Sequence, residues 1–244
     1  TSLGLPELTG PFLLAGAAYA LAGAVIWVLL RPDPLLVAQA DARRTPAASV
    51  ATPAGPVGRG VVVGAAVMVL TQVAMVAIMT MTPVHMRGHD HGLDAVGFVI
   101  GMHVGAMFLP SLVTGRLVDR VGRIPMAVAA AVTLLLAGVV AAAAPGESLP
   151  VLTVALVLLG LGWNFGLISG TALLIDSTPL ERRARVQGNV DVLVALAGAG
   201  GGVMSGFVVT ATSYAVLALV GGVLALLLVP IVAWHRREPA AALG

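Results

Sequence analysis

Four polar side chains interrupt long apolar runs of this sequence, and they are the residues best suited to do chemistry. They are Gln72, His103, Asn164 and Asp191. Amides can hydrogen-bond a solute, and a histidine changes charge near physiological pH, so His103 is a candidate for carrying protons. For Gln72, His103 and Asn164 the alternative is an interhelical hydrogen bond. For Asp191 it is a helix cap or a pairing with Arg185.

Helical spacing places further polar and small residues on the faces of three of these four. The shared faces are His103, Met107, Ser111 and Thr114; Asn164 and Thr171; and Asp191, Gly198 and Ser205. Polar stripes of this kind are expected of helices around a water-accessible cavity. Gly198, Gly202 and Gly206 recur at every fourth position. That spacing predicts close helix packing, with bending as the alternative.

Enzyme motifs and metal sites receive little support. His85, His89, Asp90 and His91 offer ligands that suit Zn or Ni, but their spacing matches no standard motif, so we predict a solvated loop and no metal. Cysteine is absent, and so are the H-E-x-x-H, phosphate-loop, dinucleotide and serine-elbow patterns. We therefore predict no enzyme activity and no cofactor.

The composition is that of an integral membrane protein. Charged residues make up 10% and apolar residues 59% of the 244, and the mean hydropathy is +1.03, whereas soluble domains carry about 25% charged residues. Runs of about 20 residues can cross a hydrocarbon core of about 30 Å as helices. Seven runs qualify: 12–30, 61–82, 95–114, 124–144, 149–175, 190–211 and 214–234. We predict an all-α protein with seven transmembrane helices.

The arginines predict the orientation. With the N-terminus outside, twelve of the thirteen basic residues face the cytoplasm and only Arg87 lies outside. The twelve are Arg31, Arg43, Arg44, Arg59, Arg116, Arg120, Arg123, Arg182, Arg183, Arg185, Arg236 and Arg237. Because they decorate loops beside the membrane, the high isoelectric point does not indicate nucleic-acid binding. Residues 31–60, rich in Pro and Ala, read as a flexible loop.

The polar stretch from Gly115 to Arg123 separates two apolar runs and is predicted to be a tight turn. Gly115 and Gly122 would allow the backbone of a hairpin. Asp119 could cap a helix or meet a neighbouring helix's positive end. The arginines could hold carboxylates or lipid phosphates. The alternative is an ordinary positively charged cytoplasmic loop.

This stretch, Gly-Arg-Leu-Val-Asp-Arg-Val-Gly-Arg, resembles the G-x-L-x-D-R-x-G-R signature of the major facilitator superfamily. In that family the signature follows the second helix of each six-helix half, whereas here three runs precede it. The resemblance therefore implies helices six to twelve of a twelve-helix transporter. Its parts would be a last first-half helix (1–30), a cytoplasmic central loop (31–60), the second half (61–234) and a cytoplasmic tail (235–244). Helices one to five of the same protein would be missing.

The resemblance extends to Gly160–Gly166 and to Glu181–Asp191, which are similar to segments of bacterial members of the family. It implies secondary transport of a small-molecule substrate by alternating access in a bacterial cell membrane. The residues of the conformational latch would be Gly115, Asp119, Arg120, Gly122 and Arg123. A different class remains as the alternative, a seven-span sensor or intramembrane enzyme. What precedes Thr1 would separate the two.

Overall fold

The computed structural model describes residues 9–33, 36–37, 40 and 58–235, and every regular element within them is helical. Contacts group the chain into two units, Thr1–Pro56 and Val57–Gly244. The described part of the first unit contains α1 (Thr9–Leu29). Most of the predicted loop 31–60 lies outside the described residues, and so does the tail beyond residue 235. The division of the chain into two transporter halves therefore stays a prediction.

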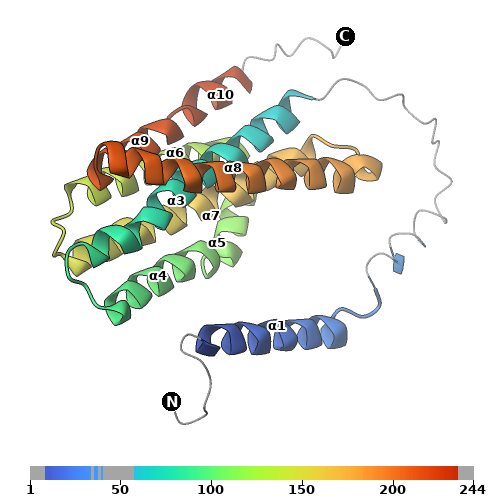
Figure 1. The fold of residues 1–244 in the computed structure, drawn as a ribbon. Helices are drawn as coiled ribbons and strands as arrows, with labels where there is room; N and C mark the ends of the chain where they lie inside the picture. The colour runs from blue at the N-terminus through green and yellow to red at the C-terminus, as the bar shows by residue number, and fades with distance from the viewer. Residues whose placement is uncertain (1–8, 34–35, 38–39, 41–57, 236–244) are drawn as a thin grey trace. The chain divides into compact units, whose positions relative to one another are not determined.

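The second unit is a helical bundle (Figure 1). Its elements are α3 (Arg59–Arg87), α4 (Leu93–Phe108), α5 (Ser111–Val121), α6 (Arg123–Ala143), α7 (Leu149–Asp176), η1 (Leu180–Arg182), α8 (Arg183–Ala211), α9 (Tyr214–Ala225) and α10 (Leu228–His235). Together with α1, the described residues hold seven segments long and apolar enough to cross a membrane. The seven predicted spans are confirmed, and so is the all-α fold.

Two of the spans consist of two α-helices each, and a proline accompanies each break. Proline lacks the N–H that continues a helix and clashes with the preceding turn. Pro110 lies between α4 and α5 and accepts the first hydrogen bond of α5, from Thr114 N–H at 2.8 Å. Pro230 follows the break between α9 and α10, where the Leu226 and Leu227 N–H groups bond to carbonyls only three residues back.

The centre of the bundle is formed by α3 and α7. Helix α7 packs against α6, α3 and α4, and α3 packs against α7, α8 and α9. About half of the most apolar segment of each is buried, 56% in α3 and 50% in α7, against 17% in the α4–α5 span and in α8. The α4–α5 span and α8 therefore present broad exposed faces. Helix α9 buries one face and exposes the other.

The predicted turn 115–123 is wrong in extent. Helix α5 continues through Gly115 to Val121, and Gly122 alone separates it from α6. The span Leu93–Val121 has 29 residues, about 43 Å of helix, so its last turns extend beyond a hydrocarbon core of about 30 Å. The polar residues there lie in the end of a helix that has left the hydrocarbon core, and not in a loop. Gly122, with φ +105°, does supply the predicted backbone freedom.

Candidate functional site

Asn164 joins α7 to the α4–α5 span through three hydrogen bonds. Its Oδ1 accepts from Thr114 Oγ1 at 2.6 Å, and its Nδ2 donates to Met107 O at 2.7 Å and to Ser111 Oγ at 3.0 Å. The Asn164 side chain is buried. The stripe predicted on the third span is therefore real, but it faces α7 instead of an open cavity.

His103 lies on the same face, one turn before Met107, and is fully buried. Its Nδ1–H donates to the backbone carbonyl of Leu156 on α7 at 2.8 Å. Its Nε2 has no hydrogen-bond partner among the described residues. The two helices approach closely here, because a Cβ on Gly160 would lie 2.5 Å from His103 O. The bond to Leu156 is the one that a structural histidine would make, and the proton-carrying role stays a prediction.

Gln72 on α3 is bound to Trp163 on α7, whose indole Nε1–H donates to Gln72 Oε1 at 2.8 Å. Phe108 at the end of α4 meets the Trp163 ring edge-on, with centroids 5.7 Å apart and planes at 72°. On the side of α8, Gly198 makes room for the amide, since a Cβ there would lie 2.9 Å from Gln72 Nε2. All four residues lie near the middle of their spans, so four helices converge at one depth.

Phe108 and the role of Trp163 were not predicted from the sequence. An aromatic residue in an apolar run has no contrast with its neighbours, so its type alone does not mark it. The available signal was position. Phe108 follows His103 by five residues, and Trp163 immediately precedes Asn164.

Asp191 stands apart from this group. It lies two turns into α8, is exposed, and accepts a hydrogen bond from Gln187 Nε2 at 2.8 Å. It is therefore not a helix cap, and the described residues include no ion pair between Asp191 and Arg185, so both structural predictions for it are wrong. Its assignment to a proton or substrate pathway stays a prediction.

The rest of the predicted α8 stripe packs against α3. Ser205 Oγ lies 3.0 Å from Thr80 Oγ1. A Cβ on Gly202 would be in van der Waals contact with Val76, whereas one on Gly206 would meet nothing within 4 Å. Close packing is thus confirmed for Gly198 and Gly202, and wrong for Gly206.

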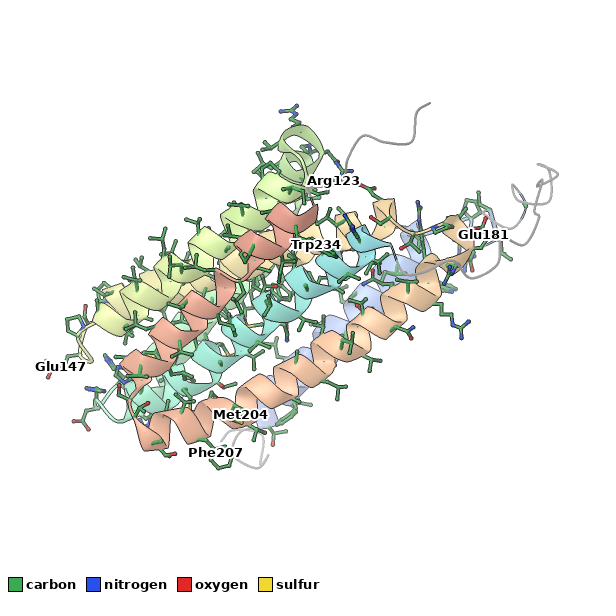
Figure 2. All side chains as sticks on the ribbon, turned by 90° about the horizontal axis from the view of Figure 1, so that it is seen from above. Arg123, Glu147, Glu181, Met204, Phe207 and Trp234 are labelled. Atoms are coloured by element: carbon green, nitrogen blue, oxygen red, sulfur yellow. The ribbon has the colours of Figure 1, made fainter. Side chains whose placement is uncertain are left out.

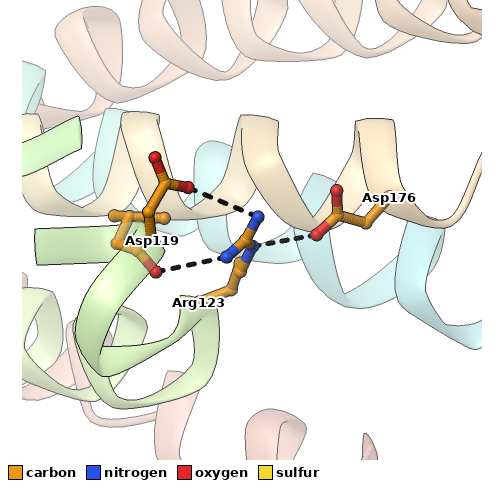
Figure 3. A network of polar contacts seen from close by, with 4 residues as sticks. Asp119, Arg123 and Asp176 are labelled. Atoms are coloured by element: carbon orange, nitrogen blue, oxygen red, sulfur yellow. Dashed lines mark hydrogen bonds and ion pairs between the residues drawn. The ribbon is translucent and has the colours of Figure 1, made fainter. Parts of the chain in front are cut away.

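The signature stretch forms a polar network around Arg123 at the start of α6 (Figure 3). Arg123 Nε donates to Asp176 Oδ2 at 2.8 Å, and its guanidinium also lies 3.4 Å from Asp119 Oδ1. It further donates to Val118 O. No side chain caps α6, so the predicted capping role of Asp119 is wrong. Asp176, at the end of α7, was missed because its run was taken to end at Ile175.

Three histidines cluster with Tyr214 at the C-terminal end of α3. The His85 ring stacks on Tyr214 with centroids 4.3 Å apart and lies 4.4 Å from the His89 ring. His91 Nε2–H donates to Gly146 O at 2.9 Å. Among the described residues, no three His, Asp or Glu side chains are placed to hold a metal ion. The rings here pack and bond to the backbone.

Comparison with known proteins identifies relatives along the whole chain. The chain is 60% identical over 240 residues to the Uncharacterized MFS-type transporter YdeG of Bacillus subtilis (strain 168), covering 96% of this chain and 56% of that protein. It is 54% identical over 244 residues to the Uncharacterized MFS-type transporter YddS of the same strain, covering 97% and 56%. The Riboflavin transporter RfnT of Brucella anthropi is 30% identical over 227 residues, covering 91% and 56%.

The chain thus spans little more than half the length of the curated relatives it matches, and its seven spans correspond to about half of a twelve-helix transporter. Family-level comparison agrees, with matches to the Major Facilitator Superfamily over residues 2–163 and 88–243. Members of this superfamily are transporters and not enzymes. The chain belongs to the Major Facilitator Superfamily.

Proposed function

We propose that the protein containing this chain moves a small solute across a bacterial cell membrane by secondary active transport with alternating access. The observation that carries the proposal is the convergence of Gln72, Trp163, Phe108 and Gly198 near the middle of four spans. Transporters of this kind bind their solutes near the bilayer midplane, and polar side chains at that depth mark the pathway.

The exposed faces of the bundle support the same conclusion. The α4–α5 span and α8 bury far less than α3 and α7, and Gln72 and Trp163 are only partly buried between them. We propose that N-terminal helices of the same protein cover this side and complete the solute cavity. A cavity shared between two halves allows one half to rock against the other around a bound solute.

We propose that the arginine-rich end of the bundle faces the cytoplasm. Arg59, Arg123 and Arg183 each lie at the first residue of a helix, and Arg87 lies at the far end of α3. Figure 2 shows Arg123 and Glu181 toward one end of the bundle and Glu147 and Phe207 toward the other. The excess of arginine at one end follows the positive-inside rule. The contact between Arg123 and Asp176 would then act in the conformational latch on the cytoplasmic side.

Proton coupling through His103 is the finer part of the proposal. Among the described residues His103 is the one His, Asp, Glu or Arg side chain that is fully buried, and its Nε2 is unpartnered. A His103→Asn variant keeps a hydrogen-bond donor, because an amide N–H takes the place of the imidazole N–H, but an amide cannot carry a proton. We expect it to retain solute exchange and to lose accumulation driven by a pH gradient. Unchanged accumulation in the variant would remove His103 from the coupling mechanism.

The transport proposal is tested with the full-length protein in proteoliposomes. Riboflavin is the first solute to measure, because the relative RfnT is named as a riboflavin transporter, and a panel of sugars, amino acids and nucleosides follows. We expect counterflow of one solute, reduced by Gln72→Ala but not by Gln187→Ala near the start of α8. A protein that exchanges no solute of the panel would contradict the proposal. Equal effects of the two variants would remove Gln72 from the site.

A further inference from the structure

We infer that the solute presents an uncharged flat aromatic ring to this half of the protein, bound in the corner between Phe108 and Trp163 with Gln72 as its hydrogen-bond partner. The inference rests on the proposed transport function and specifies the substrate class of the same site. It follows from ring geometry, from the hydrogen bonds of Gln72, and from the position of charge in the bundle.

The two rings form a corner. Phe108 and Trp163 lie at 72° with centroids 5.7 Å apart, so the edge of one meets the face of the other. The Phe108 side chain is 57% exposed although it lies near the middle of its span. A flat ring can stack on the face of one member of such a pair while its own edge meets the face of the other, and both arrangements are favourable for aromatic rings.

Gln72 holds this corner in place and keeps hydrogen-bonding capacity for a solute. The indole N–H can only donate, so the atom of Gln72 that accepts it is Oε1. The Nε2 group then carries two N–H donors and lies beside Gly198, whose missing side chain leaves space for the amide. A ring nitrogen or carbonyl oxygen is the matching acceptor.

Charged groups are distant from the corner. The described Asp, Glu and Arg residues of α3, α4, α7 and α8 lie in the end turns of these helices, apart from Asp191, two turns into α8. None of the described Asp, Glu or Arg side chains could act as counter-ion to a charged solute group here, and His103 is fully buried against α7. Charge without a counter-ion is costly at mid-membrane depth. The bound portion is therefore neutral, and a flat heteroaromatic ring fits both the stacking surfaces and the amide.

The test is equilibrium binding of lumichrome, a neutral, flat, tricyclic heteroaromatic compound, to the purified full-length protein by fluorescence polarisation. The chain offers a matched control. Phe98 lies on the same helix α4 and is 55% exposed, and it makes no ring contact with the described residues. We expect Phe108→Leu to raise the Kd about two- to tenfold, the range of an aromatic contact, and Phe98→Leu to leave it unchanged. Phe108→Tyr, which keeps the ring, should bind like the wild type.

Each outcome decides the inference. Lumichrome binding that is weakened by Phe108→Leu and by Trp163→Ala, but not by Phe98→Leu, supports it. No lumichrome binding by the wild type overturns it, and so do equal effects of the two Phe→Leu variants. If Phe108→Leu fails to fold, Phe108→Tyr and Trp163→Ala decide. If the protein transports a non-aromatic solute and does not bind lumichrome, this inference is overturned but the proposed transport function is not. If the protein transports no solute, the proposed transport function itself is overturned.

Discussion

The bond between Thr114 and Asn164 offers a quantitative test of how α5 and α7 are held together. Thr114 Oγ1 donates to Asn164 Oδ1 at 2.6 Å, and both side chains are buried. Thr114→Val keeps the shape and removes the hydroxyl. An interhelical hydrogen bond in a membrane contributes about 0.6 kcal/mol on average and up to about 1.7, and a buried acceptor left without a donor adds to the cost. We expect a loss of about 1–2 kcal/mol in unfolding free energy.

Thr133→Val on α6 is the matched control. Thr133 Oγ1 donates to Ala129 O at 2.8 Å within its own helix, and that carbonyl already belongs to the helix ladder, so the change should stay within about 0.5 kcal/mol. The measurement is the unfolding of the full-length protein in mixed micelles with increasing SDS, followed by circular dichroism. Equal destabilisation by the two Thr→Val variants would refute the reasoning.

A double-mutant cycle makes the same test sharper. Asn164→Ala removes all three hydrogen bonds of the amide and should cost more than Thr114→Val. Once Asn164 is gone, Thr114→Val has no acceptor left to lose. The two changes should then be non-additive by at least about 0.5 kcal/mol. Strict additivity would mean that the Thr114–Asn164 bond does not form in the membrane.

Three further predictions concern packing, the signature network and the turn. Gly138→Ala should lower the unfolding free energy in the same SDS assay by about 1–3 kcal/mol, because a Cβ at Gly138 would meet the backbone of α9. Gly206→Ala is the control. A Cβ there would have nothing within 4 Å, so the unfolding free energy should change by less than about 0.5 kcal/mol. Asp176→Asn should change stability by less than about 1 kcal/mol, because its pair with Arg123 is partly exposed, while the rate of transport in proteoliposomes should fall. Gly122→Ala should lower the unfolding free energy in the SDS assay by about 1–3 kcal/mol, because φ +105° with ψ 156° is a backbone conformation open essentially to glycine alone.

The spans were predictable because their signal is strong and local. A run of about 20 apolar residues has few alternatives to a transmembrane helix, and all seven runs became helices or helix pairs. The ends were less predictable. Polarity alone does not distinguish a loop from a helix that has left the hydrocarbon core, so Gly115 to Val121 were assigned to a turn although they continue α5.

The residues of the site could be predicted from the sequence, but the contacts between them could not. Periodicity correctly placed His103 and Thr114 on one face of their span, but it does not specify which neighbour that face meets. The rotation and depth of each helix depend on packing against all the others. Only the folded bundle shows that this face contacts Asn164 on α7 and that Asp191 is exposed. Asp176 and Phe108 acquire their significance in the same way, from partners distant in sequence.

The hydrogen-bond capacity of the two amides, Gln72 and Asn164, separates their roles. Asn164 uses its Oδ1 and both donors of its Nδ2 within the protein, so a solute would have to displace an existing bond to reach it. Gln72 uses its Oε1 for Trp163, and its two N–H donors make no hydrogen bond to the described residues. Breaking a buried bond costs about what a new one returns. We therefore expect Asn164 to fix the approach of α4 and α5 to α7, and Gln72 to be the amide that meets the solute.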